Sequence, residues 1–438
     1  MLSNLMALFV PMTMAALNLS TPRGEQIIKI PAANSSQSEI CVIPKKYPNA
    51  VYSPKDIKSE QELCSLNGTQ PAALCPKMVS TNPAVEFYSV PEGMTASQVE
   101  SKRCDVEGSK KLAKYKGSIS CSYTPSLLAY YHISRILGNV VQVPPVVLRT
   151  MDLKEHREIA AKAAVAVPAK DSLLKQIWQG FSNHLNAGAS SSKKDALFTS
   201  DFTQSYGALQ QNPRNEEKYT EMFFSAKAPQ TRAEAFGARS PIYALLKDSS
   251  SVKSLVGTQW TASNVQKLLQ MQNVADMIVL DHMLSQQDRF GNVHYSNTFY
   301  YLDSSTGTPE LKRNNKMDEN EVRATNAVMV KHMMLKDNDC GVTKDNAAKK
   351  AGLLKRLSHI SPSTYARLLR LNADMSTEAT RTFFMDETMM TKADYSLVKE
   401  NLSEIVQTLQ KACKEGTLKL DLDMDAHFAN KQINQSCG

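Results

Sequence analysis

Residues 274–292 read VADMIVLDHMLSQQDRFGN, and this stretch decides how the rest of the chain is interpreted. Its apolar residues recur at the spacing of one helix face: Met277, Ile278, Leu280 and Leu284. The polar residues 287–292 follow, with Gly291 as a turn signal. The pattern predicts a buried helix that runs into a tight polar loop.

This loop carries two oxygen-bearing side chains four residues apart, Asp288 and Asn292. At a helix exit this spacing lets both serve one site. Phosphoryl transfer uses such a pair, because a carboxylate orients the attacking hydroxyl and an oxygen ligand holds a magnesium ion. A second interpretation stays open, in which Asp288 and Arg289 form a surface ion pair and the glycine only makes a turn.

Residues 328–342, VMVKHMMLKDNDCGV, form a second informative stretch. Near-alternation of apolar residues predicts a strand that runs into two carboxylates, Asp337 and Asp339. Hard oxygen ligands suit Mg²⁺ or Mn²⁺, so either carboxylate would complete a metal site, although an acidic turn without an ion is also possible. A calcium loop of the EF-hand type is disfavoured, because no glutamate closes the segment after Gly341.

The regions around these stretches predict a small mixed unit followed by a mainly helical one. Residues 110–148 indicate strand, helix and strand, in the segments 110–121, 124–138 and 140–148. Polar stretches predict loops or insertions at 187–212 and 303–326. Helical patterns occupy the remainder, at 152–166, 171–186, 215–227, 262–286, 345–357, 362–373 and 390–413.

Length and charge exclude several classes of protein. At 438 residues the chain suggests two packed lobes or two to three domains, and 42% hydrophobic residues are typical of a globular protein. The net charge of +8 is modest, and the sequence contains no basic block with interleaved aromatic residues. We therefore predict no nucleic-acid partner. Oligomeric state is not predicted.

The N-terminal region and the cysteines predict an exported protein. Residues 5–17 resemble the apolar core of a signal peptide, although a buried helix is an alternative; the segment is too short to span a bilayer, and no other candidate span follows. Eight cysteines without a C-x-x-C pair favour disulfides over buried thiols. We therefore expect a secreted, periplasmic or secretory-pathway lumenal protein that has no membrane span.

Taken in order, the motifs resemble one kinase family. Residues 131–138 (YHISRILG) precede 143–145 (VPP), the Asp288-Arg289 pair, 335–338 (LKDN) and 363–369 (STYARLL). This set, covering roughly residues 105–375, resembles the atypical secretory-pathway kinases of the Golgi casein kinase and four-jointed type. The D-R-F-G-N loop is more distantly similar to HipA and the phosphatidylinositol 3- and 4-kinases.

The resemblance implies a two-lobed, protein-kinase-like α+β fold stabilised by disulfides. Its expected parts are a signal peptide at 1–17, a disulfide-rich extension at 18–100, a small mixed N-lobe at 101–150 and a mainly helical C-lobe at 151–438. The expected cofactors are ATP and Mg²⁺ or Mn²⁺. The expected acceptor is a hydroxyl on a protein or glycan; a lipid kinase and a pseudokinase scaffold are the alternatives.

The resemblance also implies roles for individual residues. Asp288 would be the catalytic aspartate, and Asp337 and Asn292 would be metal ligands. Lys114 would hold the phosphates, with Lys116 on the same strand face as the alternative.

Two features of the family plan are missing from this sequence. Leu127 stands where the plan has a glutamate that pairs with the phosphate-binding lysine, so we expect this ion pair to be absent or to be supplied from elsewhere, for example by Glu107 or Glu155. Since no G-x-G-x-x-G precedes Lys114, we expect other backbone amides to cover the phosphates.

Overall fold

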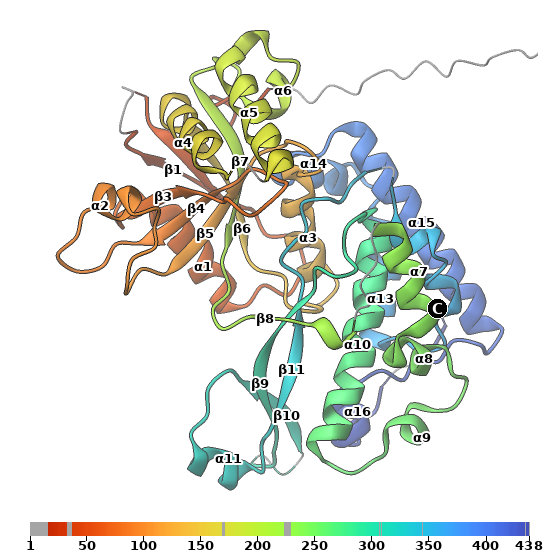
Figure 1. Ribbon diagram of the computed structural model, residues 1–438. Helices are drawn as coiled ribbons and strands as arrows, with labels where there is room; N and C mark the ends of the chain where they lie inside the picture. The colour runs from red at the N-terminus through yellow and green to blue at the C-terminus, as the bar shows by residue number, and fades with distance from the viewer. Residues whose placement is uncertain are drawn as a thin grey trace, which may run out of the picture.

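The computed structural model describes residues 16–437 except 33–36, 169–170, 223–228, 306, 308, 344 and 434. The predicted signal peptide therefore lies outside the described residues, apart from Ala16 and Leu17. The chain forms a sheet-containing lobe, a helical lobe and a hairpin arm that projects from between them (Figure 1). This mixed architecture confirms the predicted α+β class.

A seven-stranded antiparallel sheet forms the first lobe, in the order β1-β2-β6-β7-β5-β4-β3. Its strands are β1 (Gln26–Ile30), β2 (Glu39–Ile43), β3 (Ala72–Pro76), β4 (Val85–Ser89), β5 (Lys111–Lys116), β6 (Val146–Asp152) and β7 (Gln204–Gln211). The expected boundary at residue 150 falls inside β6, and the expected extension supplies β1 to β4. Strand pairing across long sequence distances makes this lobe larger than the 101–150 segment.

The stretch 187–212 corrects a prediction, since its last part is a central strand and not a loop. β7 lies between β6 and β5, and its backbone pairs with both. Its polar side chains Gln204, Ser205 and Gln210 are buried. Buried polar residues have the same sequence pattern as a solvated loop, which is why composition misled here.

Helices cover both faces of this sheet. Val146 and Leu148 of β6 pack in one core with α3 (Thr124–Ile136), whereas Val147 and Met151 pack on the other face. That period of two is the geometry of a strand buried on both sides. The remaining helices of the lobe are α1 (Pro54–Ser65), α2 (Ala96–Ser101), α4 (Leu153–Ala166), α5 (Ser172–Ala187) and α6 (Lys194–Leu197).

The helical lobe is built around α10 (Ala262–Met283), which is buried from residue 273 to its end. Its neighbours are α7 (Pro229–Arg239), α8 (Pro241–Lys247), α9 (Val252–Val256), α12 (Ala347–Lys350), α13 (Pro362–Asp374), α14 (Glu378–Glu387), α15 (Lys392–Lys414) and α16 (Met424–Phe428). The helices predicted at 262–286, 362–373 and 390–413 are confirmed to within three residues. Strong apolar periodicity marks each of these long helices, which is why their positions were readable.

Two predicted helices differ from the structure. Residues 215–227 hold β8 (Glu217–Lys218) and a 3-10 turn, and their last five residues lie outside the described part. Residues 345–357 hold only α12 and another 3-10 turn.

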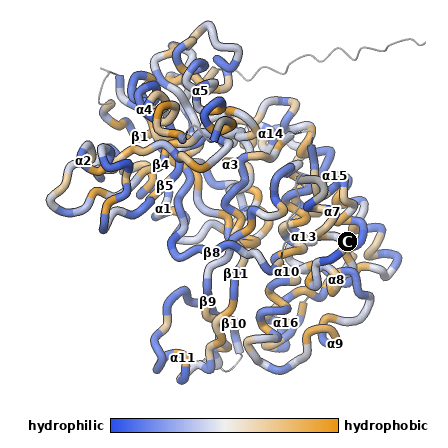
Figure 2. The backbone as a smooth tube through the Cα atoms, in the orientation of Figure 1, coloured by the Kyte–Doolittle hydropathy of each residue, from blue (hydrophilic) through white to orange (hydrophobic). Residues whose placement is uncertain are grey.

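The hairpin arm brings the two motif-bearing segments together. β9 (His294–Asp303) pairs with β10 (Glu310–Asn314) and with β11 (Val328–Met334), and α11 (Glu319–Thr325) lies at its far, largely hydrophilic end (Figure 2). In the β9–β11 ladder His294 faces Met334. The chain enters β9 just after Asn292 and leaves β11 just before Asp337, so both loops lie at one end of the arm.

All eight cysteines are paired, as Cys41–Cys64, Cys75–Cys104, Cys121–Cys340 and Cys413–Cys437. This confirms the prediction of disulfides. The Cys121–Cys340 bond joins the segment after β5 to the segment after β11 and so connects the two lobes. Among the described residues, no helix is both long and apolar enough to cross a bilayer.

Gly207 tests the close packing of the central strands. A Cβ at this position would lie 2.4 Å from the carbonyl oxygen of Lys116 on β5. We expect Gly207→Ala to lower the free energy of unfolding by about 1–3 kcal/mol, the usual cost of an overpacked core. Gly180→Ala in α5, where a Cβ meets nothing within 4 Å, should raise it by up to about 1 kcal/mol. Urea unfolding of both variants measures these changes in stability, and equal changes would contradict the close approach of Gly207 to the Lys116 backbone.

Candidate active site

The loop after α10 places Asp288 and Asn292 together, as predicted. The Asn292 amide nitrogen donates to the Asp288 carboxylate at 3.0 Å and to its carbonyl at 2.9 Å. Gly291 between them has a φ of +101°, which glycine adopts without strain. Arg232 of α7 donates to the other Asp288 oxygen at 3.0 Å and to the carbonyl of Phe290 at 2.8 Å. Asp288 is therefore fixed from two sides.

Arg289 is a buried structural group and not a partner of Asp288. Its side chain is fully buried and forms a bidentate ion pair with Asp281 of α10, with donor–acceptor distances of 2.9 and 3.1 Å. It also donates to the side chain of Asn338 at 2.6 Å and to the carbonyl of Asp337 at 3.3 Å. The interpretation of residues 288–289 as a surface ion pair is therefore wrong.

The Asp281 carboxylate has two further effects on this cluster. It accepts a hydrogen bond from Tyr130 of α3 at 2.7 Å. Burial by itself would lower the pKa of Arg289, yet Asp281 holds that pKa above its usual range. Arg289 therefore stays charged and joins α10, its own loop and the loop after β11.

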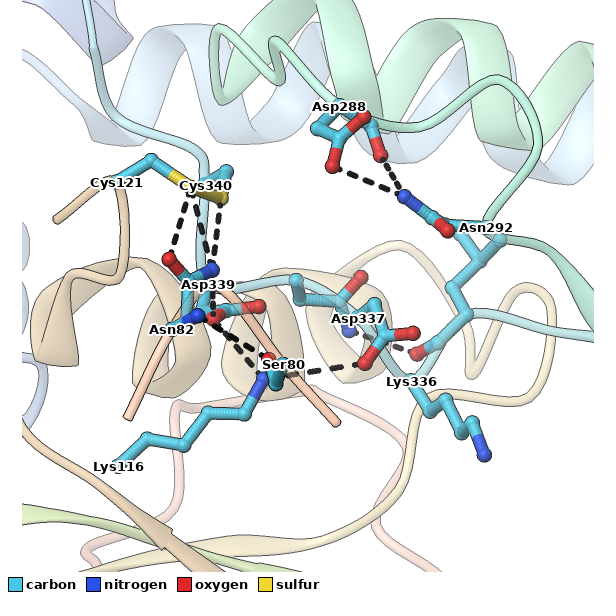
Figure 3. A network of polar contacts seen from close by, with 12 residues as sticks. Ser80, Asn82, Lys116, Cys121, Asp288, Asn292, Lys336, Asp337, Asp339 and Cys340 are labelled. Carbon is cyan, nitrogen blue, oxygen red and sulfur yellow. Dashed lines mark hydrogen bonds and ion pairs between the residues drawn. A yellow bond between two sulfur atoms is a disulfide. The ribbon is translucent and has the colours of Figure 1, made fainter. Parts of the chain in front are cut away.

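The loop after β11 is also fixed by the first lobe. The hydroxyl of Ser126 donates to the carbonyl of Asn338 at 2.5 Å, and the backbone nitrogen of Tyr123 donates to the carbonyl of Asp339 at 2.9 Å. Asn82 donates to the Asp339 carboxylate at 3.2 Å and contacts the sulfurs of the Cys121–Cys340 bond (Figure 3). The acidic loop therefore lies where the two lobes meet.

Lys116 points from β5 to this acidic loop (Figure 3). Its ammonium lies 2.9 Å from an Asp339 oxygen and 3.8 Å from an Asp337 oxygen. Burial opposes charge on Lys116, but the two aspartates, Asp339 foremost, raise its pKa. Among the described residues, neither Glu107 nor Glu155 forms an ion pair with Lys114 or Lys116, and the carboxylate closest to Lys116 is that of Asp339.

Lys114 differs from Lys116 in having no partner. Its side chain is buried, with 4% exposed, and it forms no hydrogen bond or ion pair within the described part of the chain. Burial lowers its pKa to about 7, and the nearby ammonium groups of Lys116, Lys77 and Lys336 add to this, while Asp337 opposes it. Near pH 7 the Lys114 amine is therefore divided between its charged and neutral forms, and a bound anion would favour the charged form.

The carboxylates carry opposite pKa shifts. Burial would raise the pKa of Asp337, but four surrounding lysines hold it well below its usual range, namely Lys116, Lys114, Lys77 and Lys336. Burial raises the pKa of Asp288, and the charge of Arg232 only partly offsets this, while Asp339 and Asp337 raise it further. The three aspartates are thus close enough to interact, and Asp288 has the strongest affinity for a proton.

The three predicted metal ligands, Asn292, Asp337 and Asp339, differ in how far their oxygen atoms are already engaged by other residues. Within the described ranges, no three His, Cys, Asp or Glu side chains are arranged as a metal cluster. Asp339 is fully buried and engaged by Lys116 and Asn82, so it does not fit a ligand role here. The side chain of Asp337 is 26% exposed, and within the described part of the chain the one ion-pair contact of its carboxylate is with Lys116, at 3.8 Å. Asp337 and the half-buried Asn292 fit a Mg²⁺-type ion that keeps several waters.

Four site residues were not found from the sequence: Asp281, Arg232, Lys77 and Asn82. Asp281 had a signal, because a charged residue within the apolar run 274–284 indicates a buried ion pair. Lys77 and Asn82 follow β3, in a segment whose local pattern carries no mark of a site. Arg232 reaches Asp288 only because α7 packs beside the loop.

The buried contacts of Arg289 with Asp281, Asp337 and Asn338 predict that loss of the Asp281 charge strongly destabilises the fold. Asp281→Asn leaves the guanidinium buried without its countercharge, so we expect the free energy of unfolding to fall by about 3–5 kcal/mol. Glu319→Gln in α11 removes the same charge from an exposed pair with Arg323 and should change it by less than about 0.5 kcal/mol. Urea unfolding compares the two variants, and a small effect for Asp281→Asn would show that the ion pair between Asp281 and Arg289 contributes little to stability.

Comparison with known proteins gives structural neighbours only. No protein-family model matches the sequence, and no curated protein matches it. A crystal structure of the Golgi casein kinase is 14% identical, with a TM-score of 0.41, and the match covers 83% of this chain and 78% of that one. A crystal structure of the Golgi casein kinase with Mn/ADP bound is 13% identical, with a TM-score of 0.40, covering 82% and 77%. Both neighbours are of the kinase type that the ordered motifs resemble.

Proposed function

We propose that this protein is a phosphotransferase that moves the γ-phosphoryl group of ATP to a hydroxyl acceptor in the presence of Mg²⁺ or Mn²⁺. One observation carries the proposal: two carboxylates held by different loops, Asp288 and Asp337, meet beside a group of buried lysines. Phosphoryl transfer requires little covalent chemistry from a protein and consists mainly of positioning and charge stabilisation. The arrangement supplies both.

Asp288 is the residue that contacts the acceptor. Its carboxylate is one-third exposed, and Arg232 and Asn292 fix its orientation. It accepts a hydrogen bond from the attacking hydroxyl and takes its proton as the hydroxyl oxygen bonds to the γ-phosphorus and the bond from that phosphorus to the leaving ADP breaks. The raised pKa of Asp288 makes it a better proton acceptor than Asp337, whose pKa is lowered.

Asp337 and Asn292 are the residues that would hold the divalent ion. When bound, that ion neutralises charge on the phosphate oxygens. Arg289 donates a hydrogen bond to the carbonyl of Asp337, and the Asn292 side-chain amide donates one to the carbonyl of Asp288, so both positions are fixed before a ligand arrives. Preorganised charge of this kind stabilises a transition state without reorganisation during the reaction.

Lys114 supplies the positive charge that meets the nucleotide phosphates. Lys116 is already neutralised by Asp339, so of the two predicted lysines Lys114 is the one without an ion-pair partner among the described residues. A group of charges of one sign attracts ligands of the opposite sign.

A nucleotide-binding scaffold without turnover is the second candidate. The Arg232 ion pair with Asp288 favours it, because the same carboxylate oxygen would have to receive the acceptor. Nucleotide binding without transfer would support this candidate. Among active enzymes, a protein Ser/Thr or glycan kinase and a lipid kinase are separated by presenting each type of acceptor.

The four disulfides are consistent with an oxidising compartment. We therefore place the proposed activity in the secretory-pathway lumen, the periplasm or outside the cell.

Removing the proposed base tests the function directly. Asp288→Asn keeps the size of the side chain but cannot accept the proton, so transfer of label from γ-labelled ATP should fall by about 10²–10⁴-fold. Nucleotide-induced thermal stabilisation should remain. Asp345→Asn, at an exposed aspartate paired with Lys350, serves as the matched control and should keep full activity.

The outcomes of that experiment separate the candidates. Unchanged transfer by Asp288→Asn would remove Asp288 from the role. Nucleotide binding by the wild-type protein with no transfer to any acceptor would favour the scaffold, and the absence of both would contradict the proposal.

A further inference from the structure

The Cys121–Cys340 bond differs from the other disulfides in its position. It joins residues that are 219 apart in the sequence, whereas the partners of the other three bonds are separated by 23, 29 and 24 residues. Its sulfurs lie beside Asn82 and Asp339 of the candidate site (Figure 3). One covalent bond therefore couples the sheet lobe to the acidic loop that follows β11.

The backbone of Cys340 connects both loops that carry the site. Cys340 directly follows Asp339, whose carboxylate pairs with Lys116 at 2.9 Å. The carbonyl of Cys340 accepts a hydrogen bond from the backbone nitrogen of Gln287 at 3.1 Å. Gln287 immediately precedes Asp288, the proposed base. A displacement of Cys340 is therefore transmitted to the acidic loop and to the loop after α10.

The other end of the bond belongs to the segment that holds the acidic loop in place. Cys121 lies shortly before Tyr123 and Ser126, which donate hydrogen bonds to the carbonyls of Asp339 and Asn338. The disulfide and these two hydrogen bonds thus connect the same two segments. When the disulfide opens, the hydrogen bonds must hold this contact without it.

The surroundings leave little room for two thiols in place of the bond. Each free sulfur keeps a van der Waals distance from the other, so opening the bond pushes the two residues apart. Beside Cys340 the packing is close, because a Cβ on Gly341 would lie 2.5 Å from the hydroxyl oxygen of Ser126 and 3.0 Å from the carbonyl oxygen of Leu284. Close packing of this kind transmits strain, so the backbone of Cys340 is expected to shift.

A thiol that arrives from solvent can reach this bond at Cys121, which is half-buried, whereas Cys340 is buried. The four cysteines of the two other bonds in the sheet lobe are buried as well. The side-chain amide nitrogen of Asn82 lies 3.3 Å from the Cys121 sulfur and 3.5 Å from the Cys340 sulfur. It can therefore donate a hydrogen bond to the thiolate that leaves when Cys121 is attacked.

We propose that the Cys121–Cys340 bond is a redox-sensitive switch of the site geometry, closed in the active form and opened by a dithiol, such as a protein with two reduced cysteines. One thiolate of the dithiol bonds to the Cys121 sulfur as the bond to Cys340 breaks, and its second thiolate then displaces Cys121. The dithiol gives up two electrons and two protons and becomes a disulfide, while the chain gains two thiols. This regulation rests on the proposed function, because phosphoryl transfer is the reaction that it controls.

The first measurement is backbone hydrogen exchange of the full chain before and after reduction with dithiothreitol. Peptides that contain Tyr123 and Gln287 should exchange faster after reduction, because the amides of these residues bond the acidic loop. Cys121→Ala/Cys340→Ala should show the same faster exchange without reductant. Cys413→Ala/Cys437→Ala, which removes the bond in the helical lobe, is the matched control and should leave these peptides unchanged. Thermal unfolding checks that each variant is folded.

The second measurement is transfer of label from γ-labelled ATP in buffers with graded ratios of dithiol to disulfide. Transfer should fall by about 10²-fold as the bond opens, the size of effect expected when a catalytic group is misplaced by about 1 Å. Reoxidation should restore it. Cys121→Ala/Cys340→Ala should stay at the low rate at every ratio, whereas Cys413→Ala/Cys437→Ala should respond as the wild type does. Mass spectrometry after alkylation identifies which bond has opened.

The outcomes distinguish this inference from the proposed function. Faster exchange confined to the peptides of Tyr123 and Gln287, without transfer in any redox state, would support the switch and contradict the enzyme. Full transfer by Cys121→Ala/Cys340→Ala would overturn the switch and leave the enzyme intact. Unchanged exchange after the bond has opened would also overturn it. Faster exchange in every peptide would do the same, since the bond would then serve only global stability.

Discussion

The buried guanidinium of Arg289 is the interaction on which the arrangement of the site depends. It bonds Asp281 of the central helix α10, the side chain of Asn338 and the carbonyl of Asp337. A charge without solvent is tolerated only when its bonds are satisfied in this way, so the group cannot shift without a large cost in stability. The distance between Asp288 and Asp337, each adjacent in sequence to a member of this cluster, is fixed as a result.

Charged groups reach the site from both lobes. Lys77, Lys114 and Lys116 come from the sheet lobe, at β5 and after β3, whereas Lys336 and the carboxylates come from the loops that follow α10 and β11. The Cys121–Cys340 bond and the hydrogen bond from Asn82 to Asp339 join the two lobes at this point. Excess positive charge facing paired carboxylates is the pattern expected of a site that binds a phosphate chain with a divalent cation.

Local periodicity was enough to predict the elements that flank the site. The apolar spacing of residues 274–284 predicted α10, and alternation predicted β11. The strand β7 was missed, because its buried glutamines have the composition of a solvated loop. The extent of the first lobe was missed as well, since strands at residues 26–89 pair with partners far along the chain and a single strand carries no record of its neighbours.

The sequence by itself predicted Asp288, Asn292, Asp337 and the lysines of residues 114–116 as candidate site residues, because their residue types lie in recognisable local patterns. It also determined the long helices, since their periodicity is local. Only the tertiary structure decided what these side chains contact: Arg289 turns inward to Asp281, Lys116 pairs with Asp339, and Asn82 reaches the Asp339 carboxylate from the hairpin of β3 and β4. Burial and ion pairing depend on what packs against a residue, and packing is set by the whole chain.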